Sequence, residues 1–146
     1  MTLRTQKLMK FGGSSVANTE RIRAVASIVL NAASEGRVVV VVSAFHGVTN
    51  QLLECAHRAE QGDGTYIDLY QSLAARHEET LKALHAGRPS KRVMAEFTAM
   101  LSELHDVLQG IMMLRHSPPQ ALDLVASFGE RCSSLTVASY ISRRHP

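Results

Sequence analysis

Aromatic residues are scarce in this sequence: it contains no tryptophan, and only 5% of its 146 residues are aromatic. Proteins that bind nucleic acid usually combine a stripe of basic residues with aromatic side chains that stack on bases. Here the net charge is +3, and the arginines and lysines are spread along the chain without accompanying aromatics. The composition therefore argues against a nucleic-acid partner.

Long hydrophobic runs are also missing. No stretch approaches the roughly 20 apolar residues of a membrane-spanning helix. The opening residues, MTLRTQKLMKF, lack the apolar core and cleavage site of a signal peptide. Cys55 and Cys132 do not have metal-ligand spacing, and the histidines form no ligand-like group. We therefore expect a cytoplasmic protein with reduced cysteines, no metal site and no membrane contact.

Residues 7–43 have the pattern of a βαβ unit. A short apolar segment ends at Gly12, a helical pattern runs from Asn18 or Thr19 to Gly36, and RVVVVVS follows as a predicted strand. Five consecutive valines predict a strand that is covered on both faces, as in a parallel sheet. The fold class is therefore expected to be α/β.

The rest of the chain is predicted to be almost entirely helical. Gly129 is expected to interrupt the last helix, because glycine costs about 1 kcal/mol relative to alanine inside a helix. Two strands are few for a stable sheet, so the chain resembles the opening portion of a larger fold. The expected helices cover residues 48–61, 66–86, 90–113 and 120–143.

The stretch KFGGSSVA, from Lys10 to Ala17, joins the first strand to the first helix. Backbone N–H groups at Gly12 and Gly13, near the positive end of the helix, could bind a phosphate, and Ser14 adds a hydroxyl. Lys10 could neutralise the charge of a phosphoryl group. The same residues also suit a tight turn beside a surface lysine, and their chemistry leaves both interpretations open.

Two later segments carry further candidate residues. SAFHGVTN begins at Ser43, where the valine strand ends, and ligands of open α/β sheets bind at the carboxyl ends of strands. Ser43 and Thr49 are thus expected near the glycine-rich turn, although Thr49 also suits the N-cap of the next helix. In SFGERCSS, Glu130 could bind an ammonium group or could be a solvated glutamate that pairs with a neighbouring residue.

In this order, KFGGSSVA, VVVVVSAFHGVTNQLL and SFGERCSS resemble the N-terminal part of aspartate kinases, which belong to the amino acid kinase superfamily. The resemblance covers about residues 7–140. It implies a three-layer amino acid kinase-like fold, in which residues 1–146 form the N-terminal, aspartate-binding part of the catalytic domain. A C-terminal ATP-binding part and ACT regulatory domains would lie outside this sequence.

The resemblance also implies a reaction: transfer of the γ-phosphoryl group from MgATP to the side-chain carboxylate of L-aspartate. This reaction gives 4-phospho-L-aspartate, the first step of lysine, threonine and methionine synthesis. Lys10 would be catalytic and contact the transferring phosphate, whereas Gly12, Gly13 and Ser14 would bind the ATP phosphates. The residues that would bind L-aspartate are Ser43, Thr49 and Glu130.

Other functions stay open at this point. The chain could be a catalytically incomplete fragment or a non-catalytic interaction subunit, because the valine strand lacks visible sheet partners. It could also belong to a kinase for another amino acid. An uncovered sheet edge favours a homodimer or pairing with a complementary chain.

Overall fold

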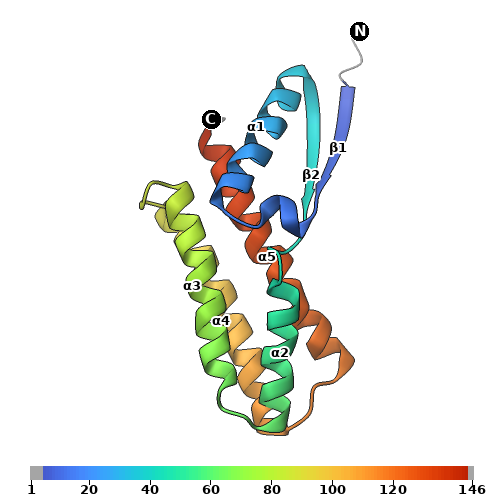
Figure 1. Ribbon diagram of the computed structural model, residues 1–146, viewed down its shortest axis with the longest axis vertical. Helices are drawn as coiled ribbons and strands as arrows, with labels where there is room; N and C mark the ends of the chain where they lie inside the picture. The colour runs from blue at the N-terminus through green and yellow to red at the C-terminus, as the bar shows by residue number, and fades with distance from the viewer. Residues whose placement is uncertain (1–4, 145–146) are drawn as a thin grey trace.

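The computed structural model describes residues 5–144, and Figure 1 shows an elongated molecule with a small sheet at one end and a helical bundle at the other. The strands and helices begin and end close to the predicted positions. In chain order they are β1 (Thr5–Phe11), the 3-10 helix η1 (Gly13–Val16), α1 (Thr19–Glu35), β2 (Gly36–Val42), α2 (Val48–Gln61), α3 (Tyr66–Leu84), α4 (Lys91–Leu114) and α5 (Pro119–Arg144).

The predicted βαβ unit is confirmed. Strands β1 and β2 pair in parallel, with Leu8 opposite Val39 and Lys10 opposite Val41. Helix α1 makes the crossover, and the side chain of Asn18 caps it by accepting a hydrogen bond of 2.9 Å from the backbone N–H of Arg21. Because the strands are parallel, both end at the same edge of the sheet, where η1 and the loop after β2 begin.

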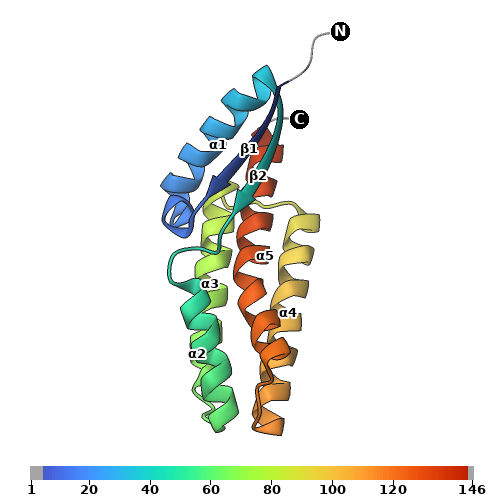
Figure 2. The same ribbon diagram turned by 90° about the vertical axis from the view of Figure 1, so that its right-hand side faces the viewer.

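The two faces of this sheet differ. Helices α1 and α5 pack against one face, on which Val42 is buried and Val38 and Val40 are half-buried (Figure 2). On the other face Leu8 is 74% exposed and Val39 is 60% exposed. The prediction that β2 is covered on both faces is therefore wrong for the part of the chain that the structure describes, in which only α1 and α5 supply a layer.

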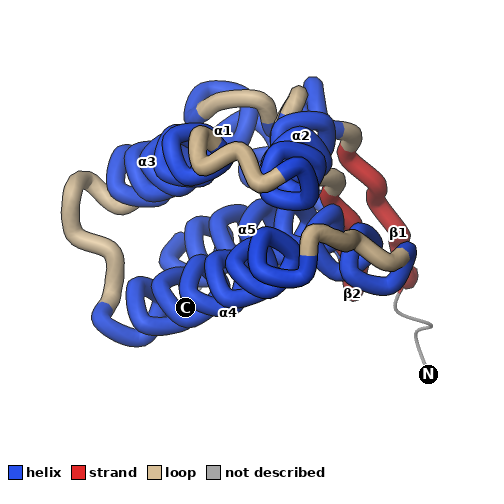
Figure 3. The backbone as a smooth tube through the Cα atoms, turned by 90° about the horizontal axis from the view of Figure 1, so that it is seen from below, coloured by secondary structure: helices blue, strands red, loops and turns tan. Residues whose placement is uncertain are grey.

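Helices α2 to α5 gather into a bundle beside the sheet (Figure 3). The predicted apolar face of α4 turns inward, and Phe97, Leu104 and Leu108 are buried on it. Helix α5 links the two ends of the molecule, because it runs from the bundle to the sheet without a break. The predicted interruption at Gly129 is thus wrong. Within residues 5–144, no helix has the length and hydrophobicity that crossing a membrane requires.

A buried histidine lies where the bundle meets the loop after β2. His77 of α3 is only 3% exposed, and its ring stacks on Phe45 with centroids 4.5 Å apart. Its Nδ1 has no hydrogen-bond partner among the described residues. Burial, together with the nearby charge of Arg76, lowers the pKa of His77 from 6.5 to about 4. The ring is therefore neutral in the folded protein at neutral pH.

This depressed pKa predicts a loss of stability in mild acid. The unfolded chain takes up a proton on His77 below about pH 6.5, whereas the folded chain resists protonation until about pH 4. Between pH 7 and pH 5 the free energy of unfolding should fall by about 2 kcal/mol through this residue. His77→Phe, which keeps the stacking on Phe45, should lose that part of the pH dependence.

Urea denaturation of both proteins at the two pH values measures the effect. His85, whose pKa is also lowered by burial and by Arg143, stays in both proteins, so the difference isolates His77. An equal loss of stability in the variant would contradict the prediction.

Candidate functional site

The carboxyl ends of the two strands open into a cleft of about 640 Å³. This is the edge of the sheet at which open α/β folds usually bind ligands, and it is where the sequence predicts the candidate residues. Three segments line it: the turn after β1, the loop and first turn of α2, and the middle of α5. The lining residues are Gly13, Ser14, Ser43, Ala44, Phe45, His46, Gly47, Thr49, Asn50 and Glu130.

Close approach of three backbone segments builds this cleft around Ala44. A Cβ on Gly13 would lie 2.8 Å from the carbonyl oxygen of Ala44, and a Cβ on Gly129 would lie 2.8 Å from the Ala44 side chain. Both distances are too short for any larger residue. Gly129 thus serves close packing of α5 against the loop and α2, and this packing brings Glu130 to the cleft.

The loop after β2 is fixed at both ends. The backbone N–H of Ser43 donates to the carbonyl of Phe11 at 3.0 Å, which extends the pairing of the strands by one step. Gly47 then adopts φ +80°, a left-handed conformation that favours glycine, and precedes the first residue of α2. Thr49 is therefore not the N-cap but lies inside the first turn of the helix, where it lines the cleft.

Lys10 and Gly12 lie outside the set of residues that line the cleft. Lys10 is exposed near the end of β1, on the uncovered face of the sheet, and its side chain makes no hydrogen bond or ion pair within residues 5–144. Gly12 precedes η1, and its carbonyl accepts a hydrogen bond of 2.9 Å from the N–H of Ser15. The structure thus brings together Gly13, Ser14, Ser43, Thr49 and Glu130.

Glu130 is exposed, and no ion pair engages it among the described residues. Its neighbour Arg131 instead pairs with Glu103 at 2.7 Å and lies over the ring of Phe128 at 4.4 Å. The hydrogen bond from Arg131 keeps the pKa of Glu103 below its ordinary value. Pairing of Glu130 with an adjacent arginine is therefore ruled out as its role in this structure.

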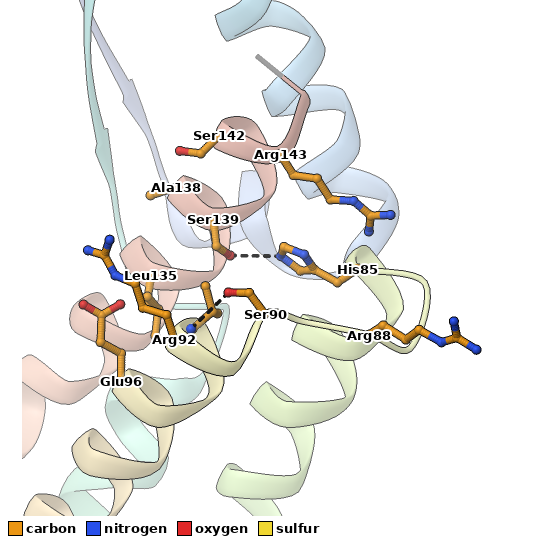
Figure 4. A pocket seen from close by; sticks show the side chains of 11 residues that line it. His85, Arg88, Ser90, Arg92, Glu96, Leu135, Ala138, Ser139, Ser142 and Arg143 are labelled. Carbon is orange, nitrogen blue, oxygen red and sulfur yellow. Dashed lines mark hydrogen bonds between the residues drawn. The ribbon is translucent and has the colours of Figure 1, made fainter. Parts of the chain in front are cut away.

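A second cleft of similar volume lies between the end of α3, the start of α4 and the end of α5 (Figure 4). His85 lies at its inner wall, where its Nε2 is 3.1 Å from the hydroxyl of Ser139. Three arginines border it, but Figure 4 shows Arg88 and Arg92 extending in different directions rather than toward one point. None of the predicted site residues lines this cleft.

Comparison with known proteins identifies the family of this chain. A model described as the amino acid kinase family matches residues 6–145. This chain belongs to the amino acid kinase family.

The relatives of this amino acid kinase chain include aspartokinases. Aspartokinase 3, chloroplastic, of Arabidopsis thaliana is 34% identical over 136 residues, which cover 93% of this chain and 24% of the relative. The bifunctional aspartokinase/homoserine dehydrogenase 1, chloroplastic, of the same plant is 32% identical over 134 residues, covering 92% and 15%. The chain therefore spans less than a quarter of the length of these relatives.

A solved structure has the same arrangement of helices and strands. E. coli aspartokinase III in complex with aspartate and ADP superposes with a TM-score of 0.81 and 26% identity. The match covers 96% of this chain and 29% of that one. It confirms the expected α/β class and the amino acid kinase-like fold.

The sequence did not predict that α3 supports the two loops that line the cleft of this amino acid kinase chain. Arg76 donates from Nη1 to the carbonyl of His46 at 3.0 Å and from Nη2 to that of Ala17 at 3.4 Å. The guanidinium of Arg76 also lies near the ring of Phe45, on which the ring of His77 stacks. The α3 sequence shows only an apolar helical pattern, which gave no sign of these contacts.

The close packing at Ala44 predicts opposite effects for two glycine substitutions in helices. Gly129→Ala should destabilise the protein by about 1–2 kcal/mol, because overpacking outweighs the gain in helix propensity. Gly110→Ala in α4 meets open space and should stabilise it by about 0.5–1 kcal/mol. Urea denaturation of the two variants and the wild type provides the comparison, and a stabilised Gly129→Ala protein would show that α5 can move away from Ala44.

Proposed function

We propose that this chain is the aspartate-binding part of an aspartate kinase, which phosphorylates the side-chain carboxylate of L-aspartate. The observation that supports this most is the position of Glu130. An exposed carboxylate on α5 shares one cleft with the hydroxyls of Ser43 and Thr49 and with the turn at Gly13. The cleft thus offers one group for a substrate cation and several groups for substrate anions.

L-aspartate carries one ammonium group and two carboxylates, and the cleft has a partner for each kind of charge. Glu130 pairs with the ammonium group, in a charge-assisted hydrogen bond that no protein cation competes for among the described residues. The hydroxyls of Ser43 and Thr49 donate to a carboxylate. These roles orient the side-chain carboxylate toward the glycine-rich turn.

The turn after β1 takes the phosphate side of the reaction. Backbone N–H groups at Gly12 and Gly13 and the hydroxyl of Ser14 are suited to phosphate oxygens, and the missing side chains let the nucleotide approach closely. Mg²⁺ supplied with the nucleotide would neutralise part of the phosphate charge. An oxygen of the aspartate carboxylate attacks the γ-phosphorus, the bond from that phosphorus to the bridging oxygen breaks, and ADP leaves.

We assign to Lys10 the stabilisation of the negative charge that builds up on the phosphoryl group during this transfer. Phosphoryl transfer depends mainly on positioning and on electrostatic stabilisation, so one mobile ammonium group beside the phosphates is a fitting contribution. Lys10 is exposed near the end of β1, and no carboxylate holds it within residues 5–144. Its side chain is thus free to turn toward a bound phosphate.

Residues 1–146 correspond, in this proposal, to the N-terminal part of the catalytic domain. Further ATP contacts come from a C-terminal part, either in the same polypeptide or in a complementary chain. The reaction takes place in a reducing compartment such as the cytoplasm, where the buried thiols of Cys55 and Cys132 stay free.

A non-catalytic interaction subunit is the second candidate function. The observation that favours it is the uncovered face of the sheet, where Leu8, Val39 and Val41 are 74%, 60% and 46% exposed. An apolar face of this kind usually packs against another layer of protein. A homodimer or a complementary chain would supply that layer.

Trapping the acyl phosphate with hydroxylamine tests catalysis. If residues 1–146 alone form aspartyl hydroxamate from L-aspartate and MgATP, Lys10→Ala should reduce the yield at least a hundredfold, because a charge at the transferring phosphate is lost. Lys91→Ala, at the exposed start of α4, is the matched control and should leave the yield unchanged.

The same assay separates the two candidate functions. A folded wild-type chain that binds L-aspartate without forming product would support the aspartate-binding part of a kinase that needs a complementary chain. A folded chain that binds neither L-aspartate nor ATP would contradict the kinase proposal and favour the interaction subunit. Preference for L-glutamate would indicate a kinase for another amino acid.

The role of Glu130 has its own test in calorimetric titration with L-aspartate. Glu130→Gln should weaken binding about ten- to a hundredfold, because the ammonium group loses a charged acceptor. Glu79→Gln, an exposed glutamate on α3, should leave the affinity unchanged. Equal affinities in the wild type and Glu130→Gln would remove Glu130 from the site.

A further inference from the structure

Arg76 lies on α3, a helix that contributes no lining residue to the cleft at the strand ends. Its guanidinium nevertheless reaches two loops that do line it. Nη1 donates to the carbonyl of His46 at 3.0 Å, and Nη2 donates to the carbonyl of Ala17 at 3.4 Å. His46 belongs to the loop after β2, and Ala17 directly follows η1. One side chain therefore connects segments that are about thirty residues apart in sequence.

Each of these two loops forms one wall of the cleft. The first carries Gly13 and Ser14, and the second carries Ser43 and, at its far end, Thr49. At the strand ends they are joined by the backbone hydrogen bond from Ser43 to Phe11 and by the close approach of Gly13 to Ala44. Arg76 adds a connection farther along both segments, beyond the last residue pair of the sheet.

The second loop is also held through a side chain. Phe45 is 1% exposed, and its ring stacks on His77 with an interplanar angle of 16°. The guanidinium carbon of Arg76 is 5.9 Å from the centroid of the same ring. Two consecutive residues of α3 thus fix both the main chain of the loop, at His46, and its buried anchor, at Phe45.

Arginine suits this position because its planar guanidinium presents several N–H donors in a fixed arrangement. Two of them can serve two carbonyl acceptors at once. A lysine ammonium has a similar charge, but it is a compact group at the end of a flexible stem. It would reach one of the two carbonyls at a time.

We propose that Arg76 is a positioning residue that fixes the distance between the glycine-rich turn and the loop after β2, and thereby the width of the ligand cleft. Its consequence for ligand affinity rests on the proposed function, whereas its consequence for loop mobility does not. Because the two walls are assigned to different ligands, loss of Arg76 weakens the binding of both, unlike loss of a residue on one wall.

Hydrogen exchange of the ligand-free chain tests the connection directly. In Arg76→Ala the amides of residues 12–17 and 44–47 should exchange about three- to tenfold faster, while those of α4 keep their rates. Arg23→Ala is the matched control, since Arg23 of α1 also donates to a backbone carbonyl, that of Ala83 at 3.4 Å, but away from the cleft. In Arg23→Ala, the amides of residues 12–17 and 44–47 should exchange at the same rates as in the wild type.

Arg76→Lys separates the two-carbonyl connection from the positive charge. It should restore slow exchange in at most one of the two loops. Urea denaturation identifies general destabilisation: the unfolding midpoint of Arg76→Ala should shift no more than that of Arg23→Ala. Unchanged exchange in both loops of Arg76→Ala, full rescue of both loops by lysine, or faster exchange throughout the bundle would each overturn the proposal.

Ligand titration adds a readout that general destabilisation does not produce. In Arg76→Ala the affinities for L-aspartate and for MgATP should fall together, by about fivefold each, whereas Glu130→Gln should weaken L-aspartate alone. A loss confined to one ligand would overturn control of the cleft width. If the wild type binds neither ligand, the proposed function fails, and the exchange rates of the two loops still decide the role of Arg76.

Discussion

The rest of the structure depends on how closely two segments approach Ala44. The turn after β1 reaches its carbonyl and α5 reaches its methyl group, and each approach requires a glycine, Gly13 on one side and Gly129 on the other. Because Ala44 is buried directly after β2, this contact joins the sheet to the bundle. The cleft lies at the same place, and Ser14 and Glu130, which directly follow the two glycines, are exposed there.

The base of the cleft is uncharged and partly buried, and its carboxylate, Glu130, is exposed. Its base consists of backbone, small residues and the buried ring of Phe45, which a neutral histidine supports from below. Glu130 and His46 line the cleft and are exposed, and Lys10 is exposed near the end of β1, outside the lining residues. This arrangement avoids the cost of burying a charge, and under the proposed function it would offer groups of opposite sign to the substrates.

Local signals were enough to predict the βαβ unit, the helix boundaries and the gathering of Ser43 with the glycine-rich turn. Each depends on turn residues, periodicity or the rule that parallel strands end together. The continuity of α5 was not predictable, because Gly129 is retained for a partner, Ala44, that is distant in sequence. The exposure of Val39 depends on which layers cover the sheet. The role of Arg76 was not predictable, because its hydrogen-bond acceptors are backbone carbonyls, which every residue carries.

The position of Lys10 on the sheet has a consequence for solubility. Lys10 shares the uncovered face with Leu8, Val39 and Val41, and it pairs with Val41 near the end of the strands. Charges at such places discourage sheets from stacking on one another. Where no further layer covers this face, the charge of Lys10 would therefore oppose stacking of two such faces, in addition to the role in phosphate chemistry that we propose for it.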